Sequence, residues 1–179
     1  MSTRFNVVAV VGAGAMGRGI AQIAAQAGSQ VLLFDAQSAA CQKARESIIA
    51  QWGKLAEKGR LSADLVQQYS RQLQCVDSLQ ALSACDLVIE AIVERLDIKQ
   101  SVFAELEAVV RDDAVLASNT SSLSVTAIAA KLKRPQRVAG YHFFNPVPLM
   151  KVVEVIPGLK TDPAVCERLS EYAREMGHT

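Results

Sequence analysis

Short apolar runs alternate with longer segments of mixed polarity along the chain. The runs are continuous and do not alternate with polar residues, which is typical of strands buried on both faces of a sheet. The predicted strands are residues 5–11, 31–34, 87–91, 115–118, 138–144 and 152–156. The predicted helices are residues 15–28, 36 to about 58, 62 to about 71, 97–109, 125–131 and 163–176.

This order of elements predicts an α/β fold. We expect a Rossmann-type, doubly wound, mostly parallel sheet, with a long helical pair inserted after the second strand. The chain has 179 residues, half of them apolar, which suits one domain over residues 1–179. Its last residues, Gly177, His178 and Thr179, follow a helix end where another strand is expected, so we expect a longer protein.

Composition excludes several classes of function. A net charge of +1 argues against a nucleic-acid or membrane-surface partner. No apolar run has the length of a membrane span and no secretory signal is evident, which favours the cytoplasm. The four cysteines, Cys41, Cys75, Cys85 and Cys166, are scattered, so we expect reduced thiols and neither a disulfide framework nor a metal site.

A glycine-rich turn joins the first predicted strand to the first predicted helix. Its sequence, Gly12-Ala13-Gly14-Ala15-Met16-Gly17, fits the dinucleotide pattern G-x-G-x-x-G, and Asp35 ends the second predicted strand. The glycines permit the turn, the approach of a pyrophosphate and close helix packing, while Asp35 would bind the adenosine ribose and disfavour a 2′-phosphate. We therefore expect NAD; the alternative is an ordinary glycine turn. Arg18 could lie near the phosphates or point to solvent.

Three side chains on neighbouring predicted elements suit the oxidation of a secondary alcohol. His142 could accept a proton, Glu154 could orient and charge-balance the imidazole, and Ser121 could hydrogen-bond the substrate oxygen. Each has an alternative interpretation. A strand-end histidine is often structural, a serine before a helix is often an N-cap, and Glu154 could be a surface carboxylate. Because Val153 and Val155 flank Glu154, we expect its side chain to be partly buried and to need a partner.

The segments Ser118-Asn-Thr-Ser-Ser-Leu-Ser, Gly140-Tyr-His-Phe-Phe-Asn-Pro-Val-Pro-Leu-Met-Lys and Val153-Glu-Val resemble the 3-hydroxyacyl-CoA dehydrogenase family, and the resemblance extends from the glycine turn to Met176. It implies that His142 is the catalytic base, paired with Glu154, and that Ser121 binds the substrate oxygen. It also implies that Asn145, Glu94, Lys99 and, more weakly, Asn119 contact the cofactor.

The same resemblance bears on Lys54 and Lys58, which are four residues apart on one face of the long helix. Alone they would be interpreted as a solvated charged face, but the resemblance implies that they bind the phosphates of coenzyme A. Trp52, on another side of this helix, could simply be core. The family also has a second, helical domain that covers the acyl group and forms most of a homodimer. Without it, we expect this chain to bind NAD and to turn over poorly.

Two other interpretations remain open. Another Rossmann dehydrogenase, of the 6-phosphogluconate or ketopantoate type, would share the glycine turn but not the His-Phe-Phe-Asn-Pro segment followed by Glu154. An NAD-binding module without catalysis of its own would share the turn and Asp35, and the intact Ser121, His142 and Glu154 argue against it.

Overall fold

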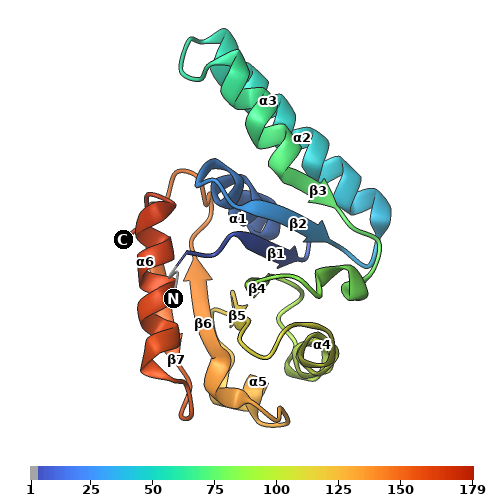
Figure 1. Cartoon of the computed structure of the whole chain (residues 1–179), viewed down its shortest axis with the longest axis vertical. Coiled ribbons are helices and arrows are strands. Elements are labelled where there is room, and N and C mark those ends of the chain that lie inside the picture. Colours follow the sequence, from blue (N-terminus) through green and yellow to red (C-terminus); the bar gives the residue numbers. More distant parts are fainter. Residues whose placement is uncertain (1–3) are drawn as a thin grey trace.

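One seven-stranded sheet forms the centre of the described part of the chain, with strand order β3-β2-β1-β4-β5-β6-β7 (Figure 1). A computed structural model describes residues 4–179. Strands β1 to β6 pair in parallel, and β7 pairs antiparallel with β6. The strands are β1 (Val7–Val11), β2 (Gln30–Phe34), β3 (Leu73–Cys75), β4 (Leu87–Glu90), β5 (Val115–Ser118), β6 (Val138–Phe143) and β7 (Val153–Pro157).

Helices cover both faces of this sheet. Helices α1, α2 and α6 share one hydrophobic core with the sheet, and α4 and α5 share a second core on the other face. Helix α3 lies against α2, and together they project from the body of the molecule (Figure 1). The helices are α1 (Ala15–Gln26), α2 (Ser38–Glu57), α3 (Ala63–Gln72), α4 (Leu96–Val109), α5 (Val125–Ala129) and α6 (Pro163–Glu175), with 3-10 turns at Leu79–Leu82 and Pro135–Arg137.

The predicted α/β class and the inserted helical pair are confirmed. Ser62 caps α3 as its sequence suggests, because its side chain accepts a hydrogen bond from the Leu65 amide. Strand β3 was not predicted. It has three residues at the edge of the sheet, and Leu73 is the one of them that is fully buried, so it carries no recognisable apolar pattern.

The expectation of four reduced thiols was wrong for two of the cysteines. Cys41, in the first turns of α2, and Cys75, at the end of β3, form a disulfide with their Cα atoms 6.1 Å apart. Thirty-four residues separate them in sequence, so their contact arises only once β3 pairs with β2 beside α2. Cys85 and Cys166 are the free cysteines of the described residues.

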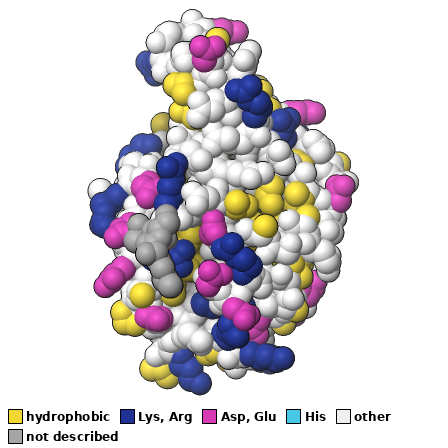
Figure 2. All heavy atoms as spheres, in the orientation of Figure 1, with side chains coloured by type: hydrophobic (Ala, Val, Ile, Leu, Met, Phe, Trp, Pro, Cys, Tyr) yellow, Lys and Arg dark blue, Asp and Glu magenta, His cyan; other side chains and the backbone are white. Residues whose placement is uncertain are grey.

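Figure 2 shows acidic and basic side chains interspersed over the viewed face, without a large patch of one sign. In residues 4–179, no helix combines the length and apolar character needed to cross a bilayer. The same residues hold no group of three or more His, Cys, Asp or Glu side chains placed to bind a metal.

Candidate active site

A cavity of about 350 Å³ opens at the carboxyl ends of the parallel strands. The chain order reverses between β1 and β4 at this edge, and in open α/β sheets ligands bind at such a point. Six residues that the sequence marked as candidates line this cavity: Met16, Glu94, Asn119, Ser121, His142 and Asn145. The fold therefore brings together segments that are far apart in the sequence.

A second cavity, of about 500 Å³, lies beside the first and includes Gly12, Ala13, Gly14 and Asp35. Its remaining lining is mostly apolar: Val11, Phe34, Ala36, Gln37, Leu79, Ala91, Ile92, Val93, Ile98 and Val102. Because Ala91 and Ile92 line both cavities, the two are adjacent. Two adjacent cavities suit an extended ligand better than a compact one.

The three glycines of the turn meet different structural requirements. Gly12 has φ of 109°, and a Cβ atom there would lie 2.5 Å from the carbonyl oxygen of Ala91. A Cβ atom on Gly17 would lie 1.8 Å from the carbonyl oxygen of Gly12, so the start of α1 could not pack on the turn. Gly14 meets nothing within 4 Å, which leaves its backbone open to a ligand.

The N-terminus of α1 is suited to an anion. No side chain caps it, and its first turn contains no acidic residue, so its partial positive charge is uncompensated within the helix. Ala15 lies at this terminus. Arg18 is exposed on α1, and its Nη1 atom lies 3.4 Å from Ser47 Oγ on α2. The turn and helix start thus fit the pyrophosphate of a dinucleotide.

Asp35 fixes the glycine turn as well as facing the second cavity. One carboxylate oxygen accepts a hydrogen bond from the Ala13 amide at 2.9 Å, and the other accepts one from the Gln37 amide at 2.8 Å. An ionised carboxylate can accept about four hydrogen bonds, so acceptor capacity remains for a ribose hydroxyl. Sequence reasoning predicted a role for Asp35 at the ribose and missed the contact with Ala13.

His142, on the wall of the first cavity, forms a hydrogen-bonded pair with Glu154. They are register partners in the antiparallel pair of β6 and β7, and His142 Nδ1 lies 2.9 Å from Glu154 Oε1. An ionised carboxylate can only accept, so Nδ1 carries the proton and donates it. Nε2 of the neutral ring is then an acceptor. The pair can therefore take up a proton at Nε2 and share the resulting charge with Glu154.

The expectation that Glu154 is partly buried was wrong, because 54% of its side chain is exposed. Successive residues of a strand point to opposite faces, so Val153 and Val155 do not describe the surroundings of Glu154. The expectation of a partner is confirmed by the bond to His142.

Ser121 lies at the mouth of the same cavity, in the loop after β5. Its backbone amide and its hydroxyl both donate to Glu94 Oε2, at 3.1 and 3.3 Å. Ser124, and not Ser121, caps α5, because its hydroxyl accepts a hydrogen bond from the Ala127 amide. The N-cap interpretation of Ser121 is therefore wrong.

Glu94 is held as an anion by its neighbours. Burial alone would raise the pKa of this carboxyl, but hydrogen bonds from Thr120 and Ser121 and the nearby Lys99 ammonium outweigh burial and lower the pKa. Its side chain is 37% exposed, so it remains accessible to a ligand. Glu94 is thus a fixed negative charge on the wall of the first cavity.

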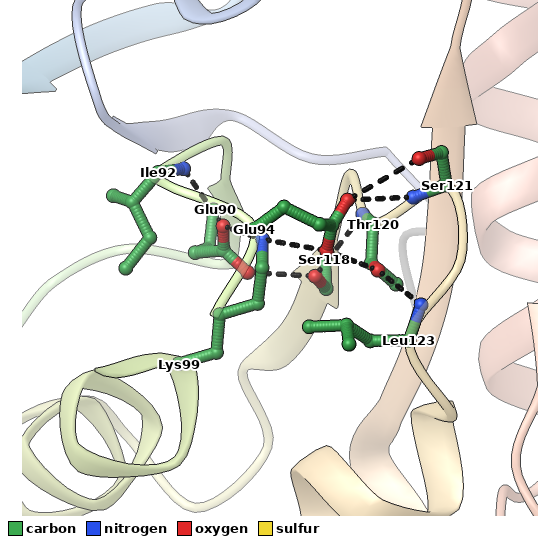
Figure 3. Close-up of polar contacts among 8 residues, drawn as sticks. All are labelled: Glu90, Ile92, Glu94, Lys99, Ser118, Thr120, Ser121 and Leu123. Carbon is green, nitrogen blue, oxygen red and sulfur yellow. Dashed lines mark hydrogen bonds and ion pairs between the residues drawn. The ribbon is translucent and has the colours of Figure 1, made fainter. Parts of the chain in front are cut away.

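Lys99, predicted to contact the cofactor, is almost fully buried. Its ammonium lies 2.6 Å from Glu90 Oε2 and 3.7 Å from Glu94 Oε1 (Figure 3). Glu90 is itself completely buried and did not emerge from the sequence reasoning. The signal was available, since an acidic residue ending the apolar strand Leu-Val-Ile-Glu must find a partner when buried.

The two candidate asparagines occupy different positions. Asn119 Oδ1 accepts a hydrogen bond from the Phe143 amide at 2.8 Å, so it ties the end of β5 to β6 next to His142. Asn145 is exposed, lies two residues after the end of β6 and lines the first cavity.

Lys54 and Lys58 lie away from both cavities, exposed at the C-terminal end of α2. Trp52 points the other way and is completely buried, with its ring against Tyr69 of α3, which confirms its core assignment.

The fold and this site define a dinucleotide-binding domain of the Rossmann type with a histidine and carboxylate pair at its reacting end. Residues 7–179 match the family described as 3-hydroxyacyl-CoA dehydrogenase, NAD binding domain. The chain belongs to this family, and the cofactor of its domain is NAD.

Curated proteins and a solved structure agree with this assignment. The chain is 46% identical over 177 residues to the 3-hydroxyadipyl-CoA dehydrogenase of Escherichia coli K12, covering 99% of this chain and 37% of that protein. It is 42% identical to a probable 3-hydroxybutyryl-CoA dehydrogenase of Deinococcus radiodurans, covering 95% of this chain and 61% of the relative. The crystal structure of the 3-hydroxybutyryl-CoA dehydrogenase from Escherichia coli K12 superimposes with a TM-score of 0.96 at 45% identity, covering 98% and 37% of the two chains.

The chain therefore spans between about a third and two thirds of the length of these relatives.

Proposed function

We propose that residues 1–179 form the NAD-binding and catalytic half of an enzyme that acts on 3-hydroxyacyl-CoA. The enzyme would transfer a hydride between C3 of a (3S)-3-hydroxyacyl-CoA and NAD⁺, giving the 3-oxoacyl-CoA, in fatty-acid or related acyl-CoA metabolism. The observation that carries the proposal is that His142, paired with Glu154, lines a cavity adjacent to the glycine turn. The family and the names of the relatives support the substrate class.

In this proposal His142 is the general base. Its Nε2 atom accepts the proton of the C3 hydroxyl, while Glu154 accepts the Nδ1–H bond and offsets the charge of the imidazolium. The bound NAD⁺ supplies the hydride acceptor. Ser121 lies on the wall of the same cavity and would hydrogen-bond the substrate oxygen, which places the hydroxyl for His142.

The cofactor would extend across the two cavities. The adenosine half would lie near Asp35 and the pyrophosphate on Gly12 to Gly17. The nicotinamide half would lie in the first cavity, near Glu94, Asn119 and Asn145. The Lys99 ammonium is buried against Glu90 and also lies near Glu94. This arrangement supports an indirect effect of Lys99 on the cofactor, through Glu94.

Lys54 and Lys58 are proposed to bind the phosphates of coenzyme A. Both are exposed and lie on the helical pair that projects from the body of the molecule (Figure 1). Cations on such a surface suit a phosphorylated ligand that reaches the cavity from outside.

Assembly and compartment are also proposals. We infer that the complete enzyme is a homodimer through a helical domain that follows residue 179, and that it acts in the cytoplasm. Size-exclusion chromatography and thiol counting after rapid alkylation in cells test the two proposals.

A second candidate is an NAD-binding module without catalysis of its own. The observation that favours it is the exposure of Ser121, Asn145 and Glu154, which leaves the reacting end in contact with solvent. If the chain binds NADH but every longer protein that contains it is inactive, the result would match this alternative.

A chimera tests the proposal directly. Residues 1–179 would replace the matching segment of the Escherichia coli relative, and reduction of acetoacetyl-CoA would be followed by the loss of NADH absorbance. We expect turnover that falls by about 10²- to 10⁴-fold in His142→Ala, since general base catalysis contributes this much. Undiminished turnover in His142→Ala would contradict the role of His142, and an inactive, folded chimera would favour the module.

A further inference from the structure

Glu90 is the most deeply buried charge beside the active site, and the proposed function gives it no role. It is completely buried, and its two carboxylate oxygens accept three hydrogen bonds. Lys99 Nζ and the Ile92 amide donate to Oε2, at 2.6 and 2.8 Å. Ser118 Oγ donates to Oε1 at 2.6 Å. A carboxylate satisfied in this way has one fixed orientation.

Two routes lead from Glu90 to Glu94 (Figure 3). The first runs through the Lys99 ammonium, which lies 3.7 Å from Glu94 Oε1. The second runs through Ser118, whose Oγ accepts a hydrogen bond from the Thr120 amide at 3.2 Å, and then through Thr120 Oγ1, which donates to Glu94 Oε1 at 2.6 Å. Both routes end on the same oxygen of Glu94, so the five residues form a closed ring, in which Thr120 takes part through its backbone amide as well as its side chain.

The ring leaves the other oxygen of Glu94 for Ser121. Glu94 Oε2 accepts hydrogen bonds from the Ser121 amide and hydroxyl. Because both routes hold Oε1, the carboxylate cannot rotate without breaking at least one of them. The orientation of Ser121 at the cavity wall thus depends on a charge pair behind it.

Stability alone does not account for this arrangement. Replacing a buried ion pair by apolar side chains is often neutral or stabilising, whereas removing one partner is costly. The pair Glu90–Lys99 is 0% and 1% exposed and lies directly behind a cavity wall that carries Glu94 and Ser121. A buried ionisable group with a specific charge partner beside a cleft is a candidate for a functional role.

We propose that Glu90 is a positioning residue that sets the orientation of Glu94 and Ser121, through Lys99 on one side and Ser118 on the other. Glu90 does not touch the ligand. By orienting Glu94 and Ser121, it fixes the positions of the polar groups that contact the nicotinamide end of the cofactor and the substrate oxygen. The identity of the ligand in this inference rests on the proposed function. The ring of contacts itself does not depend on that function.

The substitution Glu90→Gln tests this position with little change of shape. Glutamine offers one acceptor oxygen and one amide group, so it cannot accept from Lys99, Ile92 and Ser118 in the same geometry. The Lys99 ammonium loses its closest counter-charge and is drawn toward Glu94. We expect the hydrogen bond between Glu94 and the Ser121 amide to weaken.

Glu107 provides a matched control. It is a largely buried carboxylate next to a buried guanidinium, Arg137, and it accepts hydrogen bonds from the Lys133 and Arg134 amides. It lies on α4 and lines neither cavity. In Glu107→Gln we expect faster exchange at the Lys133 amide and no change at Ser121.

The first readout is amide hydrogen exchange in the ligand-free full chain. Glu90→Gln should speed exchange at Ser121 about tenfold, the effect of weakening one charge-assisted hydrogen bond, and leave Lys133 unchanged. Unchanged exchange at Ser121, or an equal rise at both amides, would overturn the proposal. Ser118→Ala breaks only the second route and leaves no charge unpaired, so it replaces Glu90→Gln if that variant does not fold; the same increase at Ser121 is expected.

The second readout is ligand affinity. Glu90→Gln should weaken NADH about tenfold and leave ADP-ribose, which lacks the nicotinamide, unchanged. Equal losses for both ligands, or no loss, would overturn the positioning role. A wild-type chain that binds neither ligand would contradict the proposed function instead, and the exchange readout would still decide whether the ring orients Ser121.

Discussion

His142 on β6 lies directly opposite Glu154 on β7, with Nδ1 and Oε1 2.9 Å apart. This placement follows from the register of the antiparallel pair, which puts the two side chains on the same face at the same level. The tautomer that leaves Nε2 free as an acceptor follows from the carboxylate. The edge strand thus provides the group that orients the base.

The effect of Glu154 on activity follows from this pairing. In the chimera with the Escherichia coli relative, Glu154→Gln should lower the rate of acetoacetyl-CoA reduction by about 10²-fold or more, because an amide can hold the wrong tautomer of His142. Steady-state kinetics with saturating NADH measures it. Glu167→Gln, on the exposed surface of α6, is the control and should keep the wild-type rate. Equal rates in the two variants would refute the role of Glu154.

Glu94 should make the stability of the chain depend on pH. Its pKa is lowered in the folded state from its ordinary value of 4.5. A lowered pKa means that the stabilisation is present above the unfolded-state pKa and is lost as the pH falls through the folded-state pKa. The difference in unfolding free energy between wild type and Glu94→Gln should therefore be largest near neutral pH and shrink in acid. Urea unfolding across that pH range measures it, and a difference independent of pH would contradict the assignment.

Two glycine substitutions should have opposite effects on stability. Gly17→Ala would place a Cβ atom 1.8 Å from the Gly12 carbonyl oxygen, so we expect a loss of about 1–3 kcal/mol together with weaker NADH binding. Gly53→Ala lies within α2 with nothing within 4 Å, and should stabilise the chain by up to about 1 kcal/mol through helix propensity. Thermal or urea unfolding of the pair tests this. Loss of stability in both variants would contradict the assigned packing.

The disulfide predicts a thiol count. Denatured without reductant, the chain should show two reactive thiols, Cys85 and Cys166, and four after reduction. Closing a loop of this length should stabilise the fold by about 4 kcal/mol, so reduction should lower the unfolding midpoint. Quantitative alkylation followed by mass measurement gives the count. Four thiols before reduction would show that Cys41 and Cys75 are not linked.

The sequence was sufficient where chemistry depends on local pattern. The glycine turn and Asp35 follow from short-range rules, whereas Glu94, Asn119 and Asn145 were indicated by the family resemblance. The structure places these three on one cavity with Met16, Ser121 and His142. Side chains that act through tertiary pairing were not accessible in the same way. Glu90 and Lys99 meet only when α4 packs behind β4, and Cys41 meets Cys75 only when β3 joins the sheet edge.

The exposure of Glu154 shows a further limit. Flanking valines suggested a buried environment, but strand geometry sends neighbours to opposite faces, and β7 is an edge strand. Whether a given face of a strand is covered depends on the elements that pack beside it, and that information is not contained in the local sequence.

Calorimetric titration of the chain with NADH and with NADPH tests the central claim most directly. The predicted result is clear binding of NADH and much weaker binding of NADPH. The substitution Asp35→Asn should reduce the difference between the two affinities, because it removes the charge that repels a 2′-phosphate. A folded sample that binds neither nucleotide, or that binds NADPH at least as tightly as NADH, would contradict the assignment of the glycine turn and Asp35 to NAD.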